Sequence, residues 1–126
     1  MPEPTILTEM ILPDQANHYG TLFGGRGLSL MTRAAFVAAS RHARRKVVLA
    51  ACHEARFDAP VPMGSLFVLS ASVTSVGRSS MKVRVSGTCE RPEQGSSSPV
   101  AQATFTMVAV DDDGRPVPVS ALEKTA

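Results

Sequence analysis

The second half of the chain alternates between apolar and polar residues with a period of two. Between 80 and 90, small or apolar side chains occupy one face and polar or charged side chains the other: Met81, Val83, Val85, Gly87 and Cys89 against Ser80, Lys82, Arg84, Ser86, Thr88 and Glu90. This alternation is typical of a strand with one buried face. Segments 66–76, 100–110 and 47–57 repeat it, and 5–12, ending at Pro13, predicts a short first strand.

Three further structural predictions concern side-chain orientation, a turn and a loop in these segments. In segment 47–57 the odd positions, among them His53, are predicted to face the core, with Glu54 and Arg56 on the other side. The pair Gly77-Arg78 separates two long strands and predicts a tight hairpin turn. The low-complexity stretch 91–99 is interpreted as a mobile loop between two strands.

The segment from about Gly24 to His42 is rich in alanine, contains no proline and predicts a helix despite its early glycines. Its many small side chains allow a curved sheet to approach the helix closely. One long helix and about five antiparallel strands predict an α+β domain in which the helix covers one sheet face. Long strands leave edges to be covered, which favours a homodimer with a continuous sheet.

The composition fits one ordinary globular domain spanning residues 1–126. The chain is 44% hydrophobic and 19% charged, so it can bury a core and does not have the composition of a disordered protein. It lacks an apolar run long enough for a membrane helix, and its first residues do not resemble a secretory signal. We therefore expect a soluble, cytoplasmic protein with no membrane partner.

The cysteines and the charges narrow the possible chemistry. Cys52 and Cys89 each lie in a predicted strand, which favours two free buried thiols over a disulfide or a metal site, and no cofactor is expected.

The net charge is only +2, but no acidic residue lies between Asp14 and Glu54, where six basic residues occur: Arg26, Arg33, Arg41, Arg44, Arg45 and Lys46. Such a segment attracts an anionic group such as phosphate. Nucleic acid is disfavoured as a partner, because aromatic residues are scarce and tryptophan is absent.

The start of the predicted helix is the strongest candidate site. Two adjacent glycines, Gly24 and Gly25, leave backbone N–H groups unobstructed by side chains at the positive end of the helix dipole. Such groups bind an oxyanion or polarise a carbonyl. The alternative is that the glycines only allow close packing of the helix on the sheet.

Four motifs then give the chain a resemblance to a known family. They are, in order, NHYGTLFGG (17–25), FDAPVPMG (57–64), VGRSS (76–80) and ATFTMVAVD (103–111). Together they resemble the hotdog-fold acyl-CoA thioesterases, in particular the bacterial broad-specificity and brain-type acyl-CoA hydrolases, over residues 6–119. The resemblance implies a hotdog fold, a central helix wrapped by a five-stranded antiparallel sheet. It also implies a homodimer, often a trimer of dimers forming a hexamer, with active sites at the dimer interface.

The resemblance assigns roles to individual residues. The thioester carbonyl is expected at the N–H of Gly25, and Asn17 is expected to position substrate or water. In relatives, a helix aspartate contributed across the interface activates the water, but Thr32 occupies that position here. A threonine hydroxyl is not a general base near neutral pH. His53 or His18 could replace the base, or could convert Thr32 into a nucleophile. The structural alternative for His53 is a hydrogen-bonded core histidine, and that for His18 is a solvated loop residue.

The hairpin turn is the expected coenzyme A site. Gly77, Arg78, Ser79 and Ser80 offer a guanidinium, two hydroxyls and backbone N–H groups for phosphate, and the matching turn of relatives lies near the coenzyme. The sequence thus predicts an acyl-CoA thioesterase in which coenzyme A belongs to the substrate. The alternatives are a catalytically weak or inactive protein that binds acyl-CoA or CoA, and a subunit that needs a carboxylate-bearing partner chain.

Overall fold

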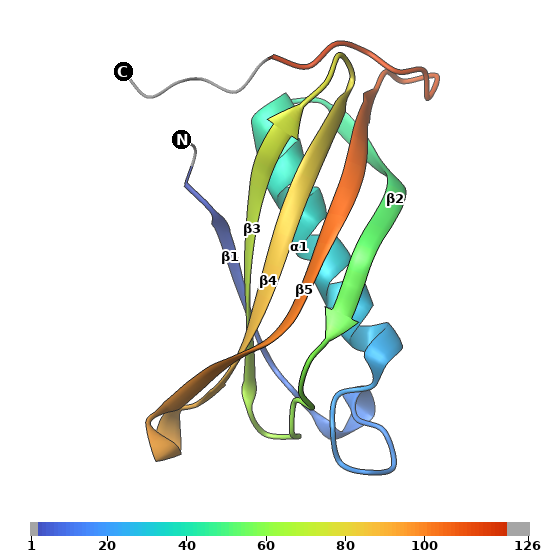
Figure 1. Ribbon diagram of the computed structural model, residues 1–126. Coiled ribbons are helices and arrows are strands. Elements are labelled where there is room, and N and C mark those ends of the chain that lie inside the picture. The colour runs from blue at the N-terminus through green and yellow to red at the C-terminus, as the bar shows by residue number, and fades with distance from the viewer. Residues whose placement is uncertain (1–2, 121–126) are drawn as a thin grey trace.

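In the part of the chain that the structure describes, one antiparallel sheet of five strands curves around a single long helix (Figure 1). The computed structural model describes residues 3–120. In chain order its elements are β1 (Thr5–Met10), η1 (Pro13–Gln15), α1 (Gly24–Ala43), β2 (Lys46–Phe57), β3 (Leu66–Val76), β4 (Ser80–Arg91), η2 (Pro92–Gln94) and β5 (Ser96–Val110). The strand order is β1-β3-β4-β5-β2, so β1 and β2 form the two edges. The α+β architecture predicted from the sequence is confirmed.

The strand bounds follow the alternation closely, except where composition suggested a loop. The prediction of a mobile loop over 91–99 is wrong. A short 3-10 helix turns the chain, and the serines that follow already pair with β4, with Ser96 opposite Arg91 and Pro99 opposite Thr88. Glycine, serine and proline are weak strand formers, but extension of the hairpin ladder satisfies their backbone groups and overrides the local preference.

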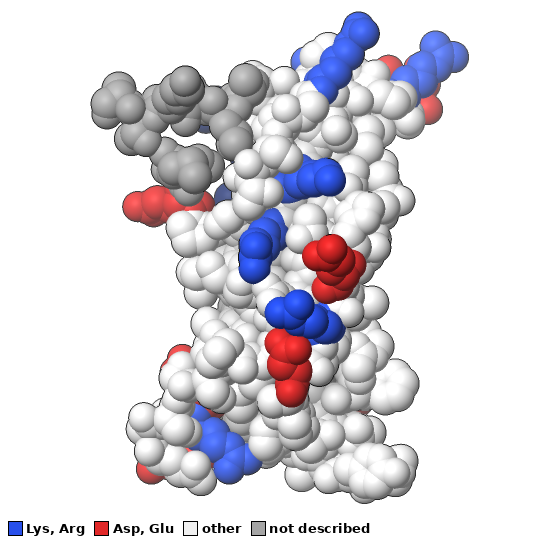
Figure 2. All heavy atoms as spheres, in the orientation of Figure 1, with Lys and Arg blue, Asp and Glu red and all other residues white. Residues whose placement is uncertain are grey.

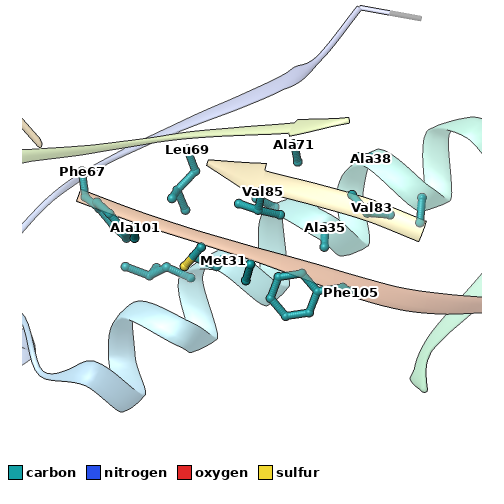
Figure 3. Packing of buried hydrophobic residues seen from close by; sticks show 14 of the residues in the cluster. Met31, Ala35, Ala38, Phe67, Leu69, Ala71, Val83, Val85, Ala101 and Phe105 are labelled. Atoms are coloured by element: carbon teal, nitrogen blue, oxygen red, sulfur yellow. The ribbon is translucent and has the colours of Figure 1, made fainter. Parts of the chain in front are cut away.

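The core lies between the helix and the concave face of the sheet. Figure 3 shows the side chains of α1, including Met31 and Ala35, against those of the strands, including Phe67 and Phe105, all of which are fully buried. Small side chains on the helix leave room for the two rings. At Gly87 the fit is tight, because a Cβ atom there would lie 2.6 Å from the Phe67 ring. The alanine-rich helix and the curved sheet are therefore complementary in shape.

The helix presents three faces with different surroundings. Buried positions such as Met31 and Ala35 face the sheet. Arg33 and Arg41 reach β1, where Arg33 lies 3.8 Å from Glu9 and Arg41 donates to Thr5. At 100° per residue, Gly25, Thr32 and Phe36 share a third face that points away from β1. We call these three residues the helix stripe.

The β2 edge is unusually exposed for a strand with apolar residues. Val48, Leu49 and Phe57 are 48%, 46% and 38% exposed, and Phe36 of the helix stripe is 46% exposed. Cys52 lies in this strand and is also exposed, while Cys89 is buried. The expectation of two buried thiols is therefore wrong for Cys52, because no other strand within residues 3–120 covers the outer edge of β2. A long, uncovered apolar edge of this kind is suited to pairing with another chain.

Candidate active site

The start of α1 is open to solvent and has no side-chain cap. Phe23 occupies the N-cap position in an extended conformation, and its carbonyl accepts the N–H of Gly27 at 3.0 Å. Within the described part of the chain, the N–H groups of Gly24 and Gly25 have no acceptor. Both glycines are exposed. The helix therefore presents bare backbone donors at the positive end of its dipole.

Aromatic rings border this start without covering it. A Cβ atom at Gly24 would meet no atom within 4 Å, whereas one at Gly25 would lie 3.0 Å from the Phe23 ring. At Gly27 a Cβ atom would lie 2.7 Å from the ring of Phe57, which approaches from β2. Close packing thus requires a glycine at Gly27, whereas the close-packing interpretation of the adjacent pair does not fit Gly24, where a side chain would meet no atom. Gly24 and Gly25 leave the amides accessible.

Asn17 holds together the loop that leads into the helix. Its Oδ1 atom accepts hydrogen bonds from the N–H of Tyr19 at 2.9 Å and from the N–H and hydroxyl of Thr21, each at 3.2 Å. The loop is tied to the helix entry by Phe23 N–H, which donates to the Gln15 carbonyl at 2.9 Å. Because the side-chain oxygen is fully used, Asn17 has only its Nδ2 hydrogens left for a substrate, as a donor.

Thr32 is half-buried, and its hydroxyl is engaged within the helix. The Oγ1 atom donates to the Leu28 carbonyl at 2.8 Å, one turn earlier. Within the protomer, no basic side chain is hydrogen-bonded to this hydroxyl among residues 3–120. Nothing in this arrangement would remove its proton, so a nucleophilic Thr32 lacks the base that it needs.

His53 does not face the core, and the prediction that it does is wrong. The register of β2 against β5 passes from Leu49–Met107 to Ala51–Thr106, so one extra residue interrupts the ladder. An extra residue shifts every later side chain to the opposite face. Cys52 takes the helix side, and His53 is exposed on the outer face, with Nε2 2.9 Å from the Thr106 hydroxyl.

A second irregularity restores the original alternation. Glu54 adopts a left-handed conformation with φ of 49°, and the ladder resumes at Arg56. Phe57 then faces the helix, as the odd-position pattern predicted. Between the two bulges the odd positions face away from the helix instead of toward it. His53 therefore lies on the far side of the sheet from the start of α1. Its role as a base within one protomer is therefore not supported.

His18 lies in the exposed part of the Asn17 loop. Its ring lies against that of Tyr19, with centroids 3.9 Å apart, and both side chains are exposed. The structure thus fits the interpretation of His18 as a solvated loop residue. No carboxylate is hydrogen-bonded to this imidazole among the described residues.

The hairpin turn lies at the other end of the protomer from the helix start (Figure 1). Gly77 N–H donates to the Ser80 carbonyl at 2.8 Å, which closes the turn, and Arg78 is exposed. The turn lies near the C-terminal end of α1, whose 20 residues span about 30 Å. The two predicted halves of the site, at Gly25 and at Arg78, are therefore not brought together within one protomer.

The basic residues of segment 26–46 do not form one patch. Arg33 and Arg41 contact β1, and Lys46 lies 2.9 Å from Asp112. On the outer face of the sheet, Figure 2 shows basic and acidic side chains intermingled. A shallow hollow on that face is lined by residues that the sequence did not indicate as site residues: Glu54, Arg56, Arg84, Gln102, Ala103 and Thr104. Two of its members, Arg84 and Gln102, are hydrogen-bonded to each other at 2.6 Å.

Residues 3–120 meet neither the requirements for a membrane-spanning helix nor those for a metal site. No helix in residues 3–120 is long and apolar enough to cross a membrane. In that range, no three histidine, cysteine, aspartate or glutamate side chains lie close enough together to hold a metal ion.

Comparison with known proteins assigns the family. Residues 19–96, more than half of the chain, match the model of the thioesterase superfamily. The chain belongs to this superfamily. It is 35% identical to an uncharacterized acyl-CoA thioester hydrolase of Zymomonas mobilis over 98% of this chain and 82% of that protein.

Solved structures of the thioesterase superfamily agree with the fold. A hexameric acyl-CoA thioesterase in its apo form matches with a TM-score of 0.93 and 35% identity, covering 98% of this chain and 79% of that one. The acyl-CoA hydrolase of Staphylococcus aureus, solved with butyryl-CoA and CoA, matches with a TM-score of 0.90 and 28% identity, covering 95% and 73%. That enzyme was also solved with an asparagine, an aspartate or a threonine replaced by alanine. The hotdog fold implied by the four motifs is thus confirmed.

Proposed function

We propose that the protein hydrolyses acyl-CoA thioesters to a free acid and coenzyme A. The observation that carries this proposal is the start of α1, where the N–H groups of Gly24 and Gly25 are open to solvent. The thioester carbonyl oxygen accepts the Gly25 N–H, and the helix dipole stabilises the negative charge that develops when water attacks the carbonyl carbon. The carbon–sulfur bond then breaks, and the thiolate of coenzyme A leaves.

The proposed catalytic unit is a homodimer located in the cytoplasm. The helix start and the Arg78 turn of one protomer lie at opposite ends of α1. A two-fold axis beside the β2 edge and perpendicular to the sheet would set two helices antiparallel, which brings the start of one helix close to the turn of the other. The exposed β2 edge supports this arrangement, and a trimer of such dimers is consistent with the hexameric relatives.

Release of free thiol from a panel of acyl-CoA esters tests this function. We expect hydrolysis by the wild-type protein, with unchanged turnover in His53→Ala, because this side chain lies on the far face of the sheet. If no acyl-CoA of any chain length releases thiol while calorimetry shows binding of CoA, the protein is not a thioesterase.

A second function, binding of acyl-CoA without turnover, is favoured by Thr32. In the Staphylococcus aureus enzyme, the separation between the replaced asparagine and aspartate equals that between Asn17 and Thr32. The position that corresponds to this aspartate thus carries a side chain that cannot act as a general base. The thiol-release assay separates the two functions.

Two substitutions at Asn17 separate its structural role from a catalytic one. Asn17→Asp keeps an oxygen for the three bonds that shape the loop but loses the Nδ2 donor, whereas Asn17→Ala loses both. We expect both variants to lose about 10-fold or more in kcat/KM, and only the alanine variant to lose stability, by about 1–3 kcal/mol. Thiol release and thermal unfolding measure the two effects. Full activity in Asn17→Asp would make the side chain purely structural.

A further inference from the structure

The chain beyond β5 folds back as a strap across the β3–β4 turn. A tight turn reverses it, with Gly114 N–H donating to the Asp111 carbonyl at 3.0 Å. Residues 115–120, which we call the strap, then run beside the end of β5, where Val117 N–H donates to the Ala109 carbonyl at 3.0 Å. In Figure 1 this red segment passes close to the yellow β3–β4 turn at the upper end of the molecule.

The strap and β5 hold two successive carbonyl groups of the turn. Val119 N–H donates to the Arg78 carbonyl at 2.8 Å, and Ala109 N–H donates to the Ser79 carbonyl at 2.9 Å. The Arg78 carbonyl and the Ser79 N–H belong to one planar trans peptide and therefore point in opposite directions. The bond from Val119 thus turns the Ser79 N–H away from the strap. In the described part of the chain, that N–H has no acceptor.

The strap is itself anchored on both sides of this contact. The Val119 side chain is half-buried and packs against the hydrophobic core. The next residue, Ser120, accepts a hydrogen bond through its carbonyl from Nε2 of His42, near the end of α1, at 2.9 Å. Because helix and core both fix the strap, the Val119 N–H has a defined position relative to the turn.

We propose that Val119 is a positioning residue for phosphate binding at the turn, which rests on the proposed function for coenzyme A as the ligand. Its N–H holds the Arg78–Ser79 peptide so that the Ser79 N–H and the exposed Arg78 guanidinium both face a phosphate group of the coenzyme. Without this bond the peptide is free to rotate and to present the Arg78 carbonyl oxygen, which repels phosphate. The strap therefore affects affinity for the nucleotide end of the substrate rather than the chemistry at the helix start.

Two proline substitutions in the strap form a matched pair. Val119→Pro and Val117→Pro each remove one strap N–H, both residues are half-buried, and each already follows a proline. Only the Val119 N–H contacts the turn, whereas that of Val117 contacts β5. We expect Val119→Pro to raise the Kd for coenzyme A about tenfold, which corresponds to the loss of about one hydrogen bond to a charged group. Val117→Pro should bind coenzyme A like the wild type.

Further measurements distinguish positioning from loss of structure. Isothermal titration with coenzyme A measures binding without any need for turnover. With acyl-CoA, Val119→Pro should raise KM and leave kcat unchanged, and an N-acetylcysteamine thioester, which lacks phosphates, should be hydrolysed at the wild-type rate. Val119→Ala keeps the N–H and loses the packing, so it should lower Tm but retain affinity for coenzyme A.

Each outcome bears on either the positioning role or the proposed function. If the two proline variants bind coenzyme A equally, or if Val119→Ala weakens binding as much as Val119→Pro, Val119 does not position the turn. If the wild-type protein binds no coenzyme A, the positioning role is also overturned. If it binds coenzyme A with the expected difference between the variants but hydrolyses no thioester, the positioning role stands and the proposed function fails.

Discussion

Replacing Thr32 by aspartate is expected to raise the turnover number for acyl-CoA hydrolysis by about 100-fold or more. A positioned general base contributes about 10²–10⁴-fold to such reactions, and Thr32 supplies none, because its hydroxyl donates to the Leu28 carbonyl. Thr32 lies on the same helix face as Gly25, two turns later, roughly 10 Å along the axis. That distance is too long for one bridging water, so we expect the new carboxylate to serve the helix start of a second copy.

The control for this gain is Thr32→Asn, which has nearly the same shape as the aspartate variant and no charge. Its turnover should stay at the wild-type level. The activity of Thr32→Asp should fall at low pH, because only the deprotonated carboxylate accepts a proton from water. Equal gains in the two variants would mean that loss of the Thr32 hydroxyl, rather than a new base, speeds the reaction. No gain in a folded variant that still binds coenzyme A would place the missing base elsewhere.

Most of the fold could be predicted from the sequence, because alternation over long segments is a strong signal. Segment 66–76 coincides with β3, and the predicted helix ends one residue short of α1. The predictions were wrong where strand pairing overrides the local preference of the residues. The serines of 96–99 join β5 because the hairpin ladder continues. The composition of this segment does not predict a strand, because serine and proline have little preference for strands.

The site was harder to predict, because one-residue irregularities decide which face a side chain joins. Alternation placed His53 in the core, and one extra residue before Ala51 moved it to the outer face. The sequence carries no glycine at either bulge, so nothing marked them. The helix begins at Gly24, as the sequence predicted. Only the structure shows that the side-chain oxygen of Asn17 accepts hydrogen bonds within its own loop. The strap contact at Val119 had no sequence signal at all.

The same geometry separates the two predicted halves of the site within one protomer. The helix start and the Arg78 turn lie at opposite ends of a helix about 30 Å long. The helix stripe lies next to the β2 edge, and its residue Phe36 is exposed. In the homodimer that we propose, two-fold pairing would cover the stripe and bring the two predicted halves of the site together. Stability of the dimer and catalysis are therefore expected to depend on the same surface.

Placing lysine at both Phe36 and Val48 is expected to give a folded monomer with hydrolysis reduced by at least about 100-fold. These side chains are 46% and 48% exposed, so the substitutions cost the protomer little, but across a two-fold axis they set like charges against each other. The matched control is the double variant Ile6→Lys and Met10→Lys, which alters two side chains that are 54% and 55% exposed on the opposite edge, β1, with the same change in charge. It should keep both the dimer and its activity. Light scattering measures the mass and thiol release the rate; a fully active monomer would show that each protomer contains a complete site.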